Sequence, residues 1–224
     1  MSESRLTWLS GEIATSCRLF SFRNSTDLSK WVVTSDASMG GFSKAEKVLS
    51  ARESVLFRGT LSTAVPATMK NSGYCALRSK PLADKSELFK IRGNHDLSDF
   101  DSLEIRLRGD GRAYAVNIQT DGIQEQDLYQ TFLYTKGGPD WETVRLPLRD
   151  FALTFRGFMQ NHQVVLNASN VRTIGFLLAD RLDGPFNLEI DYINATSWDK
   201  CYSRLDTYRR PTILDFARKQ QGGW

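Results

Sequence analysis

Short stretches in which apolar and polar residues alternate recur along most of this chain. Leu103, Ile105 and Leu107 alternate with polar side chains, and the same period of two returns in 174–178 and 186–190. This period places apolar side chains on one face of a half-buried strand. The pattern predicts strands at 18–23, 31–34, 55–61, 73–79, 102–108, 113–120, 128–135, 142–146, 171–179 and 186–193.

So many short strands with few helical stretches between them indicate an all-β protein. We predict a single β-sandwich or jelly roll over 18–198, because alternating strands and helices would need helical segments that the sequence does not offer. Residues 1–17 form a short N-terminal extension in this interpretation, and 199–224 form a C-terminal tail. Residues 24–30 are expected to make a short helical turn, and 81–95, which are polar and charged, a surface loop.

A hairpin-like stretch in the middle of the sequence has a Gly109-Asp110-Gly111 turn between two alternating segments. Arginines stand on both sides of this turn. We therefore expect Arg108, Asp110 and Arg112 to lie together at one end of a sheet.

The net charge of +3 is concentrated in the tail. Six basic and three acidic residues follow Ser197, so the rest of the chain is formally neutral. A basic tail favours an acidic protein surface, an anionic lipid or RNA, and a solvated terminus is an equal alternative. Pro211 is placed to open a short helix there. The candidate tail contacts are Arg204, Arg209, Arg210 and Arg218. The neutral sandwich has no basic stripe, so no nucleic acid is expected as a partner.

Cysteine usage and the first residues bear on the compartment. Cys17, Cys75 and Cys201 are widely spaced and include no C-x-x-C, which argues against a disulfide framework or a zinc site and favours a reducing compartment. Residues 1–20 faintly resemble an amphipathic mitochondrial presequence, although Glu3 and Glu12 weaken that pattern.

Candidate chemistry is sparse. The chain has only two histidines, and it contains no G-x-S-x-G, H-E-x-x-H or P-loop motif. Asp96, Asp99 and Asp101 could hold calcium, but the loop lacks the spacing of a calcium site, and local turn and strand-start hydrogen bonding is the preferred explanation. Glu189 and Asp191 share one strand face, which is weak support for a glycosidase pair. No cofactor, metal or enzymatic activity is predicted.

Ligand binding by aromatic stacking is a further possibility for a sandwich. This hypothesis places four aromatic residues on a concave face, together with Arg108, Arg112 and Asn117. Core packing is the alternative for each ring. The aromatic residues are Tyr114, Tyr129, Trp141 and Phe158.

A series of stretches, taken in order, resembles the complex I intermediate-associated protein 30 family. They are 31–43 (WVVTSDASMGGFS), 57–62 (FRGTLS), 72–80 (SGYCALRSK), 103–117 around the Gly-Asp-Gly turn, 135–141 (TKGGPDW), 155–157 (FRG), 174–180 (IGFLLAD) and 183–193 (DGPFNLEIDYI). The family's domain is a galactose-binding-like β-sandwich. Ten loop residues follow the family pattern and are called the signature residues below: Asp36, Gly40, Gly41, Arg108, Asp110, Arg112, Trp141, Arg156, Asp180 and Asp183.

The resemblance implies a mitochondrial assembly factor and brings no catalytic residues with it. Members associate with membrane-arm intermediates of respiratory complex I, on the matrix side of the inner membrane. The implied partners are therefore complex I membrane-arm subunits and other assembly factors, and the signature residues are expected to hold turns or to form a docking surface. A permanent accessory subunit of complex I and a carbohydrate- or nucleotide-binding module are the alternatives.

Overall fold

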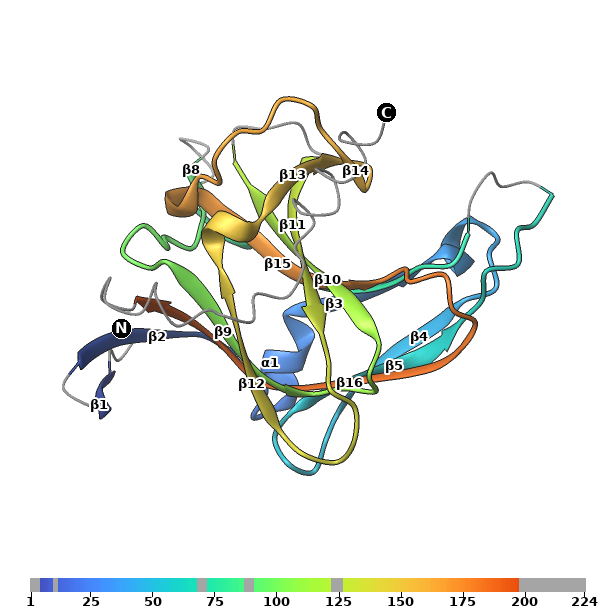
Figure 1. Cartoon of the computed structure of the whole chain (residues 1–224), viewed down its shortest axis with the longest axis horizontal. Coiled ribbons are helices and arrows are strands. Elements are labelled where there is room, and N and C mark those ends of the chain that lie inside the picture. Colours follow the sequence, from blue (N-terminus) through green and yellow to red (C-terminus); the bar gives the residue numbers. More distant parts are fainter. Residues whose placement is uncertain (1–4, 10–11, 68–71, 87–90, 122–126, 198–224) are drawn as a thin grey trace, which may run out of the picture.

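Two antiparallel sheets form the body of the protein, as a computed structural model shows (Figure 1). The structure describes residues 5–9, 12–67, 72–86, 91–121 and 127–197. Sheet A contains β1 (Arg5–Leu9), β2 (Glu12–Ser21), β4 (Lys44–Leu49), β5 (Val55–Leu61), β9 (Ser102–Arg108), β12 (Glu142–Pro147) and β16 (Gly184–Ser197). Sheet B contains β3 (Trp31–Ser35), β6 (Cys75–Ser79), β10 (Ala113–Thr120), β11 (Asp127–Tyr134), β13 (Ala152–Phe155), β14 (Phe158–Met159) and β15 (Val171–Leu178).

The two sheets share one hydrophobic core. Phe57 and Ile105 come from sheet A and Trp31 and Phe176 from sheet B, and all belong to one buried cluster. Trp31 stacks on Phe176 with ring centroids 6.3 Å apart. Because the apolar residues of each strand alternate with polar ones, the sheets can bury their facing sides only against each other. This confirms the predicted β-sandwich.

Strand β16 organises sheet A. Its first half pairs with β5 and its second half with β2, while β9 pairs along its other edge. The predicted strand 186–193 is therefore too short. The strand begins at Gly184, and Pro185 pairs with Thr60 near its start, where the missing amide proton is tolerated.

The strands that the sequence did not predict lie mainly at sheet edges. Strand β4 ends the β16–β5–β4 side of sheet A, and β13 and β14 end sheet B. Strand β4 (KAEKVL) has three charged residues and only a weak alternation, and β13 and β14 have only four and two residues, which is too short for a clear period of two. The expected loop at 81–95 also contains β7 (Leu82–Ser86) and β8 (Ile91–Gly93), which pair with each other. Likewise, the strand predicted at 18–23 begins six residues earlier, at Glu12.

The short helical turn predicted at 24–30 is confirmed as α1 (Ser25–Ser29). The Asn24 side chain accepts a hydrogen bond from the Asp27 amide at 2.9 Å, which is the usual N-cap arrangement. The other helices within the described residues are the single turns η1 (Asp36–Met39), η2 (Leu148–Asp150) and η3 (Ala168–Asn170). None of the helices in the described part of the chain has the length and hydropathy that a membrane span requires.

The Gly-Asp-Gly turn does not form a hairpin, because it carries the chain from one sheet to the other. Strand β9 pairs with β12 and β16 in sheet A, whereas β10 pairs with β11 and β15 in sheet B (Figure 1). The crossing is tight: a Cβ atom on Gly109 would lie 2.4 Å from Cβ of Thr135. Thr135 Oγ1 accepts from the Gly111 amide and donates to the Arg112 carbonyl, both at 2.9 Å. The β9–β10 connection and the β11–β12 connection, both of which cross between the sheets, therefore lie against each other.

Acid sensitivity is expected at His95, next to the core. Its backbone forms an isolated bridge with Val171, and its ring packs edge-on against Phe20 at 5.3 Å. Nε2 is buried without a hydrogen-bond partner among the residues that the structure describes. Burial lowers the pKa of His95 below its ordinary value of 6.5.

We predict that His95→Gln flattens the pH dependence of stability on the acid side of neutrality. In the unfolded chain the His95 ring takes up a proton near pH 6.5, whereas burial disfavours the protonated ring in the folded state. The contribution of His95 to the free energy of unfolding is therefore fully present above pH 6.5 and is lost as the pH falls through the lowered pKa of the folded state. Urea unfolding at about pH 7.5 and about pH 5.5 measures the difference. His162→Gln, at an exposed histidine, is the control and should leave the slope as in the parent.

Candidate docking surfaces

Asp36 holds three loop segments together at one end of the sandwich. Its side chain is fully buried, and it accepts hydrogen bonds from the Ser43 amide at 2.9 Å, the Ser43 hydroxyl at 3.0 Å and the Gly73 amide. Gly40 ends η1 in the left-handed conformation. A Cβ atom on Gly41 would lie 2.4 Å from Cγ of Asp36, so only glycine leaves room for this carboxylate. These three signature residues are therefore structural.

Arg112 and Asp180 form a second buried anchor. The guanidinium binds the carboxylate through two hydrogen bonds, at 2.8 and 2.6 Å, and also donates to the carbonyls of Leu182, Gly184 and Pro185. Burial opposes ionisation of Asp180, but the hydrogen bonds from Arg112 and from backbone amides outweigh it and lower the pKa of Asp180. These contacts fix the connection between β15 and β16 against the residue that precedes β10.

Asp110 and Asp183 complete this clamp. Asp110 accepts hydrogen bonds from the Arg112 amide at 3.0 Å, the Tyr114 hydroxyl at 3.0 Å and the Asn187 amide at 2.7 Å. Asp183 accepts from the Thr63 amide at 2.6 Å, which joins the β15–β16 connection to the one after β5. Seven of the ten signature residues therefore gather at one end of the sandwich and hold its loops.

Arg108 and Trp141 lie elsewhere, on the outer face of sheet A. Arg108 binds Glu189 at 2.5 Å, and the guanidinium carbons of Arg106 and Arg108 lie 5.5 and 5.3 Å from the centroid of the Trp141 ring. Glu189 is buried, yet hydrogen bonds from Ser54 and Arg108 hold its pKa below its ordinary value, against the effect of burial. Arg108 and Arg112 thus bind different carboxylates. Of the three residues expected together at one end of a sheet, Asp110 and Arg112 are in contact, whereas the Arg108 side chain binds Glu189.

The outer face of sheet A carries a second cation–aromatic pair beside the first. The Arg18 guanidinium lies 4.0 Å from the Tyr192 ring centroid, and Tyr192 pairs in register with Arg106. Arg106 in turn contacts Asp191 at 3.1 Å, with 44% of its side chain exposed. We call the set Arg18, Arg106, Arg108, Trp141 and Tyr192 the arginine–aromatic face.

Arg156 stands apart from the other signature residues. It occupies the turn between β13 and β14 with a positive φ of 51°, and its guanidinium lies 5.2 Å from the Phe155 ring centroid. The ten signature residues therefore do not form one site. Residues 198–224 lie outside the described residues, so the tail contacts predicted for Arg204, Arg209, Arg210 and Arg218 stay predictions.

The predicted concave aromatic face is wrong. Tyr114 and Tyr129 fill the core with 0% and 2% exposure, Trp141 covers sheet A, and Phe158 lies on the β13–β14 hairpin at the edge of sheet B. The Arg112 side chain binds Asp180 and the carbonyls of the β15–β16 connection. The acidic candidates have local partners as well: Asp96 accepts from the amide and hydroxyl of Ser98, and Glu189 and Asp191 bind different arginines.

Sequence reasoning missed Arg18, Arg106 and Tyr192, although the alternation in 102–108 already places Arg106 and Arg108 on the same face. It also missed four apolar side chains on loops, which are described below. Within the described ranges, no group of three or more histidine, cysteine or acidic residues has an arrangement that could hold a metal ion.

Comparison with solved structures defines the class of fold. The family 11 carbohydrate-binding module from Clostridium thermocellum, solved with a mixed-linked tetrasaccharide, superposes with a TM-score of 0.54 at 16% identity, covering 81% of this chain and 95% of the module. The agarase AgWH50C matches with a TM-score of 0.52 at 13% identity, over 81% of this chain and 24% of the agarase. The chain therefore has a β-sandwich fold like that of these proteins, and these identities show the fold alone.

Sequence comparison identifies the family. Residues 20–190 match the family described as complex I intermediate-associated protein 30, and the chain belongs to this family. The mouse protein named "Complex I intermediate-associated protein 30, mitochondrial" is 35% identical over 221 residues, which cover 96% of this chain and 62% of the relative. The Drosophila melanogaster protein of that name is 36% identical over 183 residues, 78% of this chain and 61% of the relative. The chain thus spans about three fifths of the length of these relatives.

Proposed function

We propose that this protein is a non-catalytic assembly factor that binds membrane-arm intermediates of mitochondrial complex I. Its proposed location is the matrix, peripherally associated with the inner membrane, and other assembly factors are proposed as further partners. Membership of the complex I intermediate-associated protein 30 family supports this role, since the relatives are named mitochondrial complex I intermediate-associated proteins.

The observation that carries the proposal is the arginine–aromatic face. Arginine, tryptophan and tyrosine are the residue types that dominate binding energy in protein interfaces. Here the arginines and Tyr192 lie on strands of one sheet, and Trp141 lies immediately before β12. Glu189 binds Arg108 and Asp191 binds Arg106, which fixes the position of these two guanidinium groups. Because the side chains are already ordered, a partner that covers them loses little conformational entropy on binding.

The physical role that follows is to cover a surface on an incomplete complex until its next subunit arrives. A partly built membrane arm exposes interface surface that lacks its final neighbour, and such surface tends to aggregate. A sandwich with a preformed contact face can occupy that surface without itself reacting.

Native-gel fractionation of mitochondria, with detection of this chain, tests the proposal. We expect the chain to migrate with species smaller than the mature complex, and to be absent from the full-size enzyme. Migration with the full-size enzyme would instead identify a permanent accessory subunit. Migration only as a free protein, when the smaller species are present on the same gel, would contradict complex I binding.

A further inference from the structure

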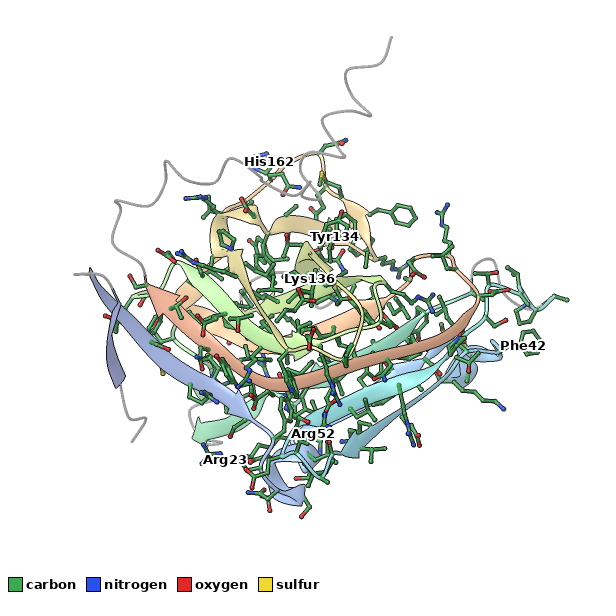
Figure 2. The ribbon with its side chains drawn as sticks, turned by 60° about the horizontal axis from the view of Figure 1, so that its bottom comes forward. Arg23, Phe42, Arg52, Tyr134, Lys136 and His162 are labelled. Carbon is green, nitrogen blue, oxygen red and sulfur yellow. The ribbon has the colours of Figure 1, made fainter. Side chains whose placement is uncertain are left out.

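Four large apolar side chains are exposed on the loops that the signature residues hold. Met39 and Phe42 belong to η1 and the loop after it, Val65 follows β5, and Leu182 lies between β15 and β16. Their exposed fractions are 56%, 57%, 54% and 61%. We call this set the apolar rim. Phe42 points outward at the end of the molecule opposite β1 (Figure 2), and η1 and the β15–β16 connection lie at that same end (Figure 1).

Hydrogen bonds bring the three loops of the apolar rim together. Ser43, next to Phe42, donates through its hydroxyl to the Ser62 carbonyl and accepts from the Ser62 amide. Thr63, two residues before Val65, donates its amide proton to Asp183, next to Leu182. The apolar rim is therefore one patch built from three segments distant in sequence. These hydrogen bonds hold the described residues of the three loops in place, which lowers the entropy that contact with a partner would cost.

The charges around the apolar rim favour an anionic partner. Lys44 and Arg181 are exposed, and neither forms an ion pair within the ranges that the structure describes. Arg112 offsets the charge of Asp180, and Asp36 is fully buried. Asp183, however, is exposed, and the hydrogen bond from the Thr63 amide lowers its pKa and keeps it charged. The exposed charged residues that adjoin the rim are therefore two cations and one carboxylate, an excess of one positive charge. Exposed apolar side chains flanked by unpaired cations are the pattern of a surface that rests on anionic lipid.

We propose that the apolar rim docks on the surface of an anionic bilayer. Met39, Phe42, Val65 and Leu182 enter the boundary between headgroups and acyl chains, while Lys44 and Arg181 contact lipid phosphates. A lipid surface fits the rim because it is fluid, so side chains on separate loops can each insert into it. The surface with the residue types of a protein interface is the arginine–aromatic face, which lies elsewhere, on sheet A. The inference rests on the proposed function only for the identity of the membrane, the mitochondrial inner membrane.

Co-sedimentation of the full chain with vesicles tests this inference. The probe is phosphatidylcholine vesicles with about one third phosphatidylglycerol, compared with vesicles of phosphatidylcholine alone. We expect binding to the anionic vesicles that weakens with salt. The Phe42→Ser/Leu182→Ser variant should bind at least about tenfold more weakly. Phe158→Ser/Val164→Ser is the matched control, because it removes a similar apolar area that is exposed on a different part of the surface.

Further measurements separate the possible results. Thermal unfolding verifies that the rim variant is folded, and Met39→Ser/Val65→Ser is a second variant with the same expected loss of binding. The inference is overturned if the parent chain does not co-sediment with anionic vesicles, or if both folded rim variants bind these vesicles as tightly as the parent does. If the rim variants instead lose complex I intermediates on native gels while the parent ignores lipid, the rim contacts protein. That result would overturn the lipid inference and leave the assembly function intact.

Discussion

Arg112→Met should lower the free energy of unfolding by about 3–5 kcal/mol, because it leaves the Asp180 carboxylate buried without its partner. Both side chains are only 12% exposed, so solvent cannot replace the lost contacts. The substitution also removes the donor to the carbonyls of Leu182, Gly184 and Pro185. For a domain of this size, the loss corresponds to a melting temperature roughly 10 °C lower.

Arg58→Met is the matched control for this prediction. Arg58 binds Glu46 at 2.7 Å, but about half of each side chain is exposed, so the change should cost at most about 1 kcal/mol. Chemical denaturation of both variants measures the difference. Equal effects of the two substitutions would show that the Arg112–Asp180 pair is not the anchor described above.

Asp36→Ala should destabilise the protein by about 3 kcal/mol, because it leaves the Ser43 and Gly73 amides without an acceptor in a buried position. Asp36→Asn should recover only part of this loss. Its amide has one acceptor oxygen, and its NH2 group is itself a donor, so it cannot accept a hydrogen bond at the position of the second carboxylate oxygen. Both effects are measured by urea unfolding, and Glu46→Ala, at an exposed carboxylate, is the control. An Asn variant as stable as the parent would mean that the carboxylate does not hold these loops.

Sequence reasoning predicted the central strands well and the edges poorly. The bounds expected for β5, β9 and β10 agree with the structure, because these strands bury one face and keep a strict alternation. Strand β4 (KAEKVL) lies at the edge of sheet A, next to β5. Its apolar and polar residues alternate only weakly, so the sequence pattern did not predict it. The direction of the Gly109–Gly111 crossing could not be predicted, because a turn sequence does not tell which sheet the next strand joins.

The candidate surfaces were only partly predictable for a similar reason. The resemblance selected Asp36, Arg112 and Asp180, and the structure shows that their partners include loop amides, loop carbonyls and each other. Arg106 and Trp141 are 35 residues apart in the sequence, so the local pattern of apolar and polar residues could not predict their contact. The exposure of Phe42 and Leu182 likewise depends on how three loops meet.

The most direct test of the account is native-gel fractionation of mitochondria that carry either the parent chain or its Arg106→Ser/Trp141→Ser variant. We expect the parent to migrate with species smaller than mature complex I. The variant should shift mostly to the free protein while remaining folded, and Arg58→Ser, an exposed arginine on the same sheet, should migrate like the parent. A folded variant that migrates like the parent would contradict docking through the arginine–aromatic face.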